Sequence, residues 1–503
     1  MDNLLRIKSG KAIRRRAIPQ IPFELFFTTL AEFIKDDGYI VQFFAYVDGE
    51  DRKIMAVLRN SALYVVETDV DSSFRSFTGG VSEKFHMFER EVAEQFGIRP
   101  DGHPWLKMVR YHQNYSGLED VFGNNYEEDI PGNYPYFKVQ GESIHEVAVG
   151  PVHAGIIEPG HFRFQCAGEE VLHLEIQLGY QHRGVEKMLP TLPHKRYPII
   201  CESIAGDTAI AHNLCMCQAF EALAGLDVDK GSRIVRTIAL ELERISNHLG
   251  DLGALSGDVA FNPPAAYFGR IRGEFLNLLQ VLSGNRFGKG LIRPGGIAFI
   301  MGKEQRLLIR EKLAEVTSEI ENVCDLLFTA HTVQARFEHT GTVSPKMAGD
   351  LGLVGYAGRA CGLSYDARNF FPGECYAELP ANSNHVTNGD VNSRAWVRRE
   401  EIMHSLKLIG LLLDMDQTAG AEVGMKEYTL SPDSFVVTVN EGWRGEVSHC
   451  LITDGAGGVQ RYKIKDPSFH NWTGLAMSLR NQEISDFPLC NKSFNLSYCG
   501  FDL

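Results

Sequence analysis

Three long segments of the chain repeat apolar residues at steps of four and three, the spacing of one face of an α-helix. One is "SRIVRTIALELERISNHLGDL" at 232–252, and the others cover 309–327 and 402–413. Each such stripe must bury its apolar face against a neighbour, so three of them predict a helical bundle. The positions are Ile234, Ile238, Leu242, Ile245 and Leu249, then Ile309, Leu313, Val316, Ile320, Val323 and Leu327, and finally Ile402, Leu406, Ile409 and Leu413.

The N-terminal part has a different pattern. A helix is predicted in "PFELFFTTLAEFIKDD", followed by β-rich runs at 39–47 and 53–70 and by a short helix in "EKFHMFEREVAEQF". A polar, aperiodic stretch then has the composition of a linker. The fold class is therefore α+β. We expect an α/β sandwich domain at 1–125, a linker at 126–140, and a mainly helical domain with small β-sheets at 141–503, whose last strands lie in 435–469.

Composition narrows the class of partner. The 503 residues carry 64 acidic and 50 basic side chains, a net charge of −14, which disfavours nucleic acid as a partner. No run approaches the ~18 consecutive apolar residues of a membrane-spanning helix, so we expect a soluble chain. Arg14, Arg15 and Arg16 form an exception to the acidic balance, either as a solvated tail or as a contact for an acidic partner or lipid headgroups.

Two common site types are not supported. The sequence has no G-x-x-x-x-G-K-[ST] motif and no G-x-G-x-x-G after a strand, which argues against a nucleotide site. Among ten scattered cysteines, Cys215 and Cys217 are the closest pair, but on a helix their side chains point about 200° apart. We interpret both as small buried apolar residues rather than zinc ligands.

Ionisable residues instead gather in segments that otherwise look buried, where such groups need partners and pKa values shift. The segment "GYQHRGVEK" carries four of them, "GPVHAGIIEPGHFRF" another four, and "ELERISNHLGDL" places Glu241, Arg244 and His248 along one helix face. The candidates for a proton-handling or acceptor pocket are Glu202, Asp207, His212, His161, His182, Arg183 and Glu186. We expect the histidines to titrate near neutrality and the pKa of the carboxyls to rise toward it.

Several of these segments resemble one known family. "GYQHRGVEK", "ELERISNHLGDLGAL", "GDVNSRAWVRREEI" and "DPSFHN" are similar to the large subunits of membrane-bound group 4 nickel–iron hydrogenases and to the D subunit of respiratory complex I. "EPGHFRF" resembles the large subunit of formate hydrogenlyase, and "FEREVAEQFGIRPDGHP" resembles the C subunit of complex I. The resemblance covers nearly the whole chain and implies a fused C–D pair.

The chain departs from the hydrogenase pattern where the metal ligands belong. Active members hold nickel and iron with four thiolates, from C-G-x-C and D-P-C-x-x-C motifs. Those positions fall on Ala205, Thr208, Ser497 and Gly500, and the neighbouring Cys201 and Cys499 are out of register. The resemblance therefore implies a hydrogenase-like subunit without a nickel–iron centre, and not an active hydrogenase by itself.

The chain also departs from the complex I pattern. The family's quinone clamp pairs a tyrosine with a histidine; the tyrosine position falls on Gly206, whereas His161 or His153 supplies the histidine. Three interpretations stay open. The chain is a subunit of an ion-translocating oxidoreductase that couples electron transfer to proton or ion pumping, a C/D-type subunit that binds quinone or another acceptor in the same cavity, or an inert scaffold.

The resemblance also implies the surroundings of the chain. No cofactor is expected in the chain itself, and 4Fe–4S clusters are expected in partner subunits. Those partners would be a small iron–sulfur subunit like the B subunit of complex I, a ferredoxin-like subunit, and membrane proteins like the antiporter and H subunits. The expected location is the cytoplasmic side of the inner membrane, as a peripheral subunit.

Overall fold

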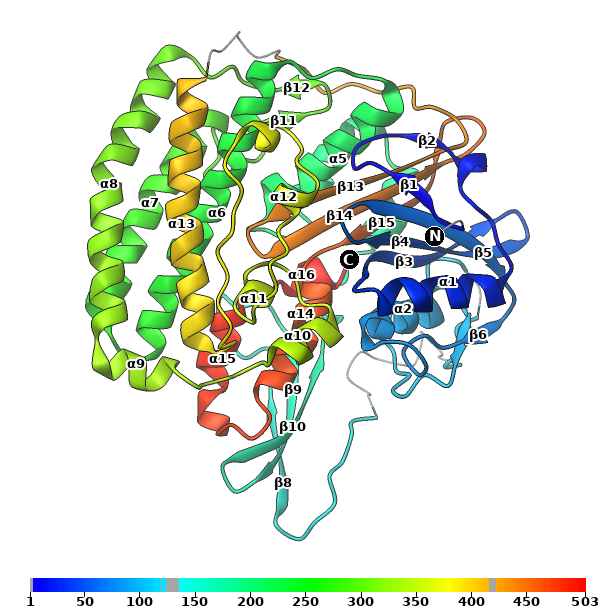
Figure 1. Ribbon diagram of the computed structural model, residues 1–503, viewed down its shortest axis with the longest axis horizontal. Helices are drawn as coiled ribbons and strands as arrows, with labels where there is room; N and C mark the ends of the chain where they lie inside the picture. Colours follow the sequence, from blue (N-terminus) through cyan, green and yellow to red (C-terminus); the bar gives the residue numbers. More distant parts are fainter. Residues whose placement is uncertain (1–2, 118, 124–134, 416–421) are drawn as a thin grey trace.

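The computed structural model describes residues 3–117, 119–123, 135–415 and 422–503. Long helices form one side of the molecule, β-sheets fill its middle, and the N-terminal unit covers the other side of these sheets (Figure 1). A three-stranded blade projects from the body. The mixed helix-and-sheet architecture confirms the predicted α+β class. Within the described residues, no helix is long and apolar enough to cross a membrane.

The N-terminal unit is a four-stranded antiparallel sheet in the order β1-β5-β4-β3. The predicted first helix is α1, and the short helix is α2. The β-rich run at 53–70 forms two strands, because Asn60 turns the chain and its Oδ1 accepts a hydrogen bond from the Ala62 N–H. The elements are β1 (Leu5–Ile7), α1 (Phe23–Lys35), β3 (Tyr39–Asp48), β4 (Asp51–Arg59), β5 (Leu63–Val70), β6 (Ser73–Arg75), α2 (His86–Phe96) and β7 (Arg99–Asp101).

The C-terminal strands form a second sheet, which is buried on both faces. It contains β13 (Ser434–Gly442), β14 (Gly445–Thr453) and β15 (Val459–Lys465), with β2 (Ile13–Arg14) at its edge. One face packs on α5; the other packs on the N-terminal sheet through side chains such as Phe44 and Val437. The N-terminal arm is thus part of a sheet and not a solvated tail, and Arg15 pairs with Asp48.

The predicted bundle is present, and its three apolar stripes lie on α6, α8 and α13. Helix α7, for which no prediction was made, packs between α6 and α8. The long helices are α5 (Ala209–Ala224), α6 (Lys230–Asp258), α7 (Asn262–Ser283), α8 (Lys303–Thr329) and α13 (Val391–Asp414). Shorter ones are α3 (Val185–Met188), α4 (Tyr197–Cys201), α9 (His331–Phe337), α10 (Pro345–Leu351), α11 (Gly355–Arg359), α12 (Ala367–Phe370), α14 (Ser468–Ser478), α15 (Phe487–Phe494) and α16 (Tyr498–Phe501); β11 (Ile292–Arg293) and β12 (Gly296–Ile297) form a small ribbon.

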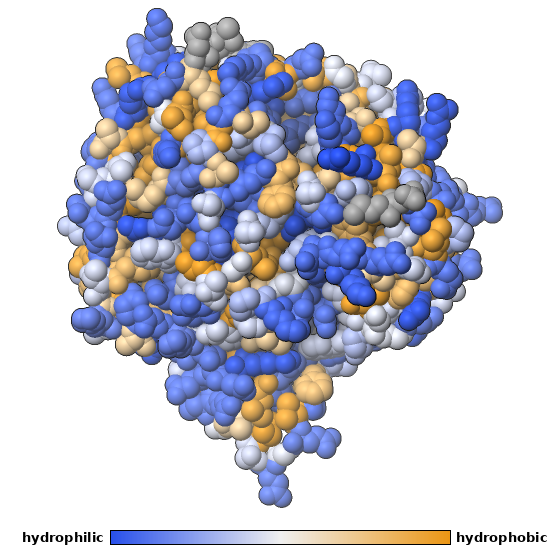
Figure 2. Space-filling model, in the orientation of Figure 1, coloured by the Kyte–Doolittle hydropathy of each residue, from blue (hydrophilic) through white to orange (hydrophobic). Residues whose placement is uncertain are grey.

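The projecting blade consists of β8 (Ile144–Val149), β9 (His161–Ala167) and β10 (Glu170–Gln177). The loop between β8 and β9 exposes apolar side chains: Val152 is 82% exposed and Ile156 is 98% exposed. Figure 2 shows hydrophobic residues gathered on this projection. Such exposed apolar groups, close together on a protruding loop, are typical of surfaces that a partner covers.

Buried ion pairs join the N-terminal unit to the C-terminal sheet. The Arg59 guanidinium lies 3.0 Å from the Glu446 carboxylate, and the Lys463 ammonium lies 2.8 Å from Glu91. Glu446 also pairs with Lys465 at 2.6 Å. The predicted linker at 126–140 lies mostly outside the described residues, so the boundaries at 125 and 141 stay a prediction. The two units nevertheless share a core and these buried charges.

Replacing Arg59 by alanine should destabilise the chain, because it leaves the fully buried Glu446 without one of its two cations. We expect the free energy of unfolding to fall by about 3–5 kcal/mol in denaturant titrations. The control is Arg310→Ala, which removes an exposed pair with Asp414 and should cost less than about 1 kcal/mol. Equal effects of the two substitutions would contradict a structural role for the buried pair.

Candidate functional site

The site is centred on Arg444, at the turn between β13 and β14. Its guanidinium donates to both carboxylate oxygens of Asp207, at 2.6 and 2.7 Å, and to the Thr208 hydroxyl at 3.1 Å. The neighbouring Trp443 indole donates to the same hydroxyl and to the Asp207 carbonyl. These bonds fix the loop of residues 202–208, which leads from α4 into α5, against the C-terminal sheet.

Asp466 is the second centre of the site, at the end of β15. Its Oδ2 lies 3.0 Å from His212 Nε2, and its Oδ1 accepts from the Ser468 N–H at 2.8 Å. Both Asp466 and His212 are fully buried. Burial opposes ionisation of Asp466, but its hydrogen bond with His212 and the charge of Arg444 lower its pKa overall.

The four positions that the motifs assign to hydrogenase cysteines lie on segments next to these two centres. Ala205 and Thr208 lie on the loop that Arg444 holds. The Ser497 hydroxyl accepts from the Gly500 N–H, which caps α16. A Cβ atom at Gly500 would meet the Asp466 carboxylate carbon at 2.8 Å, so the carboxylate occupies the space of a side chain at that position. At the positions where the motifs predict thiolates, the structure has hydroxyls and one carboxylate, and this donor set does not fit a nickel–iron centre.

The neighbouring thiols are protonated at neutral pH. Burial raises the pKa of Cys201 far above its ordinary value and that of Cys499 to about 12. Cys215 and Cys217 are fully buried on α5, where Cys217 lies 3.8 Å from the Asn213 side-chain oxygen, as expected for small apolar residues. In the part of the chain that the structure describes, no group of three or more His, Cys, Asp and Glu residues is placed to hold a metal.

The expected rise in carboxyl pKa is wrong for two candidates. Although burial opposes it, the Arg444 guanidinium lowers the pKa of Asp207. Glu186 lies between Lys463 at 2.9 Å and Arg461 at 2.8 Å, whose charges outweigh burial and lower its pKa to about 2. Both carboxylates are therefore ionised at neutral pH, because each has a cationic partner that the sequence pattern did not identify.

The expected rise in carboxyl pKa is confirmed for Glu202. Its Oε1 accepts hydrogen bonds from the Asn213 amide at 3.0 Å and the Gly290 N–H at 2.7 Å, but neither donor carries a full positive charge. Burial raises the pKa of Glu202 to about 7, although the Gly290 hydrogen bond opposes the shift. Of the carboxyls named from sequence, this one exchanges its proton near neutral pH.

The remaining candidates lie around the site rather than inside it. Arg183 donates to the carbonyls of Ser203 and Ile204, which orients the loop before Ala205. His182 Nδ1 lies 2.8 Å from the Asp502 carbonyl, and burial lowers its pKa to about 4, below the expected range. His161 begins β9 on the blade, and burial lowers its pKa as well.

Four residues at the site were not identified from sequence: Arg444, Asp466, His449 and Asp502. The signal for Asp466 was present in "DPSFHN", and Arg444 stands in "NEGWRGEV" between two apolar strands. A charged residue in such a strand context indicates a buried partner. Asp502 accepts from the N–H groups of Gly179 and Gln181, and burial raises its pKa to about 7.

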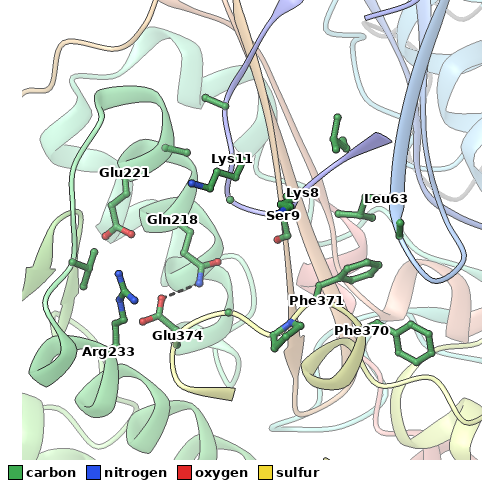
Figure 3. A pocket seen from close by; sticks show the side chains of 18 of the residues that line it. Lys8, Ser9, Lys11, Leu63, Gln218, Glu221, Arg233, Phe370, Phe371 and Glu374 are labelled. Carbon is green, nitrogen blue, oxygen red and sulfur yellow. Dashed lines mark hydrogen bonds between the residues drawn. The ribbon is translucent and has the colours of Figure 1, made fainter. Parts of the chain in front are cut away.

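A separate cleft of about 820 Å³ lies between the N-terminal arm (residues 6–12), α5 and the segment after α12 (Figure 3). Lys8, Lys11 and Arg233 line it, together with Gln218, which donates to Glu374 at 2.9 Å. No residue of the Arg444 and Asp466 centres lines this cleft. This cleft is therefore separate from the site that the motifs indicate.

Glu202→Gln should change how stability depends on pH. The folded state holds a proton on Glu202 up to pH about 7, whereas the unfolded chain releases it near 4.5, so the wild type loses stability as pH rises through this window. The glutamine variant keeps the acceptor oxygen without this loss. We expect its free energy of unfolding, relative to wild type, to rise by up to about 3 kcal/mol between pH 5 and pH 8.

The control for this measurement is Glu311→Gln, which changes an exposed residue of α8. Its stability relative to wild type should be constant over the same pH range. A Glu202→Gln curve parallel to that of wild type would show that Glu202 ionises normally in the folded chain.

Comparisons with known proteins agree with these motifs. The family described as "Respiratory-chain NADH dehydrogenase, 49 Kd subunit" matches residues 258–434 and 420–502. Formate hydrogenlyase subunit 5 of Escherichia coli (strain K12) is 28% identical over 420 residues, 82% of this chain and 74% of that protein. The membrane-bound hydrogenase subunit alpha of Pyrococcus furiosus is 28% identical over 364 residues, 70% of this chain and 85% of that protein.

The name of a third relative describes a C/D subunit, which agrees with the fused C–D pair that the motifs predicted. The C/D subunit of the NADH-quinone oxidoreductase of Bacteroides thetaiotaomicron is 28% identical over 394 residues, 73% of this chain and 74% of that protein. The resemblance drawn from the motifs is confirmed. The chain is a homologue of the 49 kDa subunit of respiratory NADH dehydrogenase and of the hydrogenase subunits related to it, and its relatives are oxidoreductase subunits.

Proposed function

We propose that this chain is the large peripheral subunit of a membrane-bound, ion-translocating oxidoreductase complex, and that it has no nickel–iron centre. Electrons would pass through an adjacent iron–sulfur subunit. A redox or protonation event in the large subunit would be coupled to the movement of protons or other ions. The proposal places the subunit on the cytoplasmic side of the inner membrane. Its partners would be the iron–sulfur, ferredoxin-like, antiporter-like and H-like subunits inferred from the family.

One observation carries this proposal. The two segments that the motifs align with the metal-binding segments of hydrogenases lie beside the Arg444–Asp207 pair and the Asp466–His212 pair. The Asp466 carboxylate fills the space beside Gly500. A pocket with ionisable groups at these positions supports proton handling rather than hydrogen chemistry.

The exposed surface supports assembly with other subunits. The loop between β8 and β9 presents Val152 and Ile156, and its Glu158 accepts from the Cys499 N–H at 3.2 Å. The apolar tip is therefore connected to the C-terminal segment of the site. A partner seated on this loop would lie close to the pocket.

A C/D-type subunit that reduces quinone is the second candidate. It is favoured by the names of relatives such as the NADH-quinone oxidoreductase C/D subunit and by His161, on the strand that borders this loop. Gly206 stands where the family has its tyrosine, and it faces open space. Quinone-dependent turnover that is abolished by His161→Gln would favour this candidate over the first.

Metal analysis of the purified complex tests the main proposal. We expect the chain to co-purify with iron–sulfur and membrane subunits, and we expect iron without nickel, because the four ligand positions carry no thiolate. Elemental analysis, electron paramagnetic resonance and identification of the subunits give the result. Stoichiometric nickel would overturn the proposal, and so would a chain that is recovered without membrane partners from gently solubilised membranes.

Asp207→Asn separates a working pocket from an inert scaffold. The substitution removes the charge that pairs with Arg444 but keeps the shape of the side chain, so we expect assembly to persist and ion pumping per turnover to fall in reconstituted vesicles. The control is Asp69→Asn, at an exposed carboxylate of β5. Unchanged pumping in Asp207→Asn would favour the scaffold.

A further inference from the structure

A continuous series of buried hydrogen bonds leads away from the site into the C-terminal sheet. His212 Nε2 lies 3.0 Å from Asp466 Oδ2, His212 Nδ1 lies 3.1 Å from His449 Nε2, and His449 Nδ1 lies 2.8 Å from the Tyr462 hydroxyl. The Cys201 thiol lies close enough to the Tyr462 hydroxyl for each to affect the pKa of the other. All five residues are 0% exposed.

The direction of these hydrogen bonds follows from the donors and acceptors. Asp466 is ionised and can only accept, so His212 must donate from Nε2. Burial lowers the pKa of His449 well below its ordinary value, so this ring is neutral and has one N–H. When His212 carries its proton at Nε2 alone, its Nδ1 accepts from His449 Nε2, and His449 Nδ1 accepts from Tyr462. Every donor then points toward Asp466.

We infer that Tyr462, His449, His212 and Asp466 form a proton relay that ends at the site. This inference rests on the proposed function and deepens it by naming the route. In one passage the Tyr462 proton moves to His449 Nδ1, the His449 Nε2 proton moves to His212 Nδ1, and the His212 Nε2 proton moves to Asp466. Tyr462 takes up one proton from a thiol or water beside it, so the relay gains one proton at Tyr462 and holds one more at Asp466.

Both ends of the relay have polar neighbours. Asp466 lies next to Arg444 and Gly500. Arg444 in turn pairs with Asp207, whose side chain is one-third exposed, so this end of the relay leads toward solvent. At the other end, the Tyr197 hydroxyl is buried without a hydrogen-bond partner among the described residues, close to Cys201. The Tyr197 ring lies 5.6 Å from that of His194, which is partly exposed. A water at Tyr197 would extend the relay toward that surface.

Asp466→Asn tests the direction of the relay without any activity. Oδ1 of Asp466 caps the Ser468 N–H, so an asparagine keeps its oxygen there and turns its NH₂ toward His212 Nε2. His212 must then accept at Nε2 and donate from Nδ1 to His449 Nε2. The proton of His449 then lies on Nδ1, so the direction of its hydrogen bonds is reversed as well. We expect the proton of both histidines to move from Nε2 to Nδ1, as seen in ¹⁵N spectra of the histidine-labelled full-length chain, with signals assigned through His449→Gln.

Asp390→Asn is the matched control. Asp390 is also a buried carboxylate that caps a helix, through the Ser393 N–H at 2.8 Å, but it is hydrogen-bonded to neither histidine side chain. The Asp390→Asn substitution should leave the tautomers of His212 and His449 unchanged. The relay is overturned if Asp466→Asn folds and the two histidines keep their tautomers, or if they change equally in the control.

Tyr462→Phe tests whether the relay is used in the assembled complex. The substitution removes the entry hydroxyl but keeps the buried ring, and we expect proton-coupled turnover to fall by about 100-fold while the set of assembled subunits is unchanged. Tyr428→Phe, at a ring outside the relay, should have no effect. Normal turnover in Tyr462→Phe would overturn the relay as a working route. A missing membrane complex would instead contradict the proposed function and leave the tautomer measurement valid.

Discussion

The C-terminal sheet is buried on both faces, and this constraint organises the rest of the structure. All nine residues of β13 and of β14 are buried, between α5 on one side and the N-terminal sheet on the other. A buried charge on these strands costs several kcal/mol unless it is paired. Glu446 therefore has Lys465 and Arg59, and Arg444 has Asp207. The site follows from the same requirement for pairing, because its polar residues belong to the sheet or its ends. These residues are Arg444, His449, Tyr462 and Asp466.

The same sheet joins the two predicted units. Its outer face forms a shared core with β3, β4 and β5, and the arm before α1 adds β2 to its edge. Buried pairs such as Lys463 with Glu91 fix the relative position of the two units. The N-terminal unit therefore contacts the strands that carry the site directly.

The elements were largely predictable from the sequence, whereas the site was predictable only in part. The stripes on α6, α8 and α13 and the helix α1 follow from local periodicity, which is independent of the rest of the fold. Asp207 and His212 lie in one region of the structure, but the expected pKa rise was wrong for Asp207 and for Glu186. The cause is the same in both: a cation more than 200 residues away in sequence, Arg444 for Asp207 and Lys463 with Arg461 for Glu186, lies within hydrogen-bond distance.

By itself the sequence determined the helical bundle, the α+β class and the resemblance to complex I and hydrogenase subunits, because each depends on local spacing or on motifs read in order. It also predicted which residues stand at the four ligand positions. The tertiary structure alone decided which ionisable groups meet. It placed Asp466 in the space beside Gly500, joined His212 to His449 and Tyr462, and gave Glu202 a pKa near 7 while it held Asp207 ionised. The physical reason is that the energy of a buried charge depends on neighbours within a few ångströms in space, and these come from parts of the chain that sequence spacing does not connect.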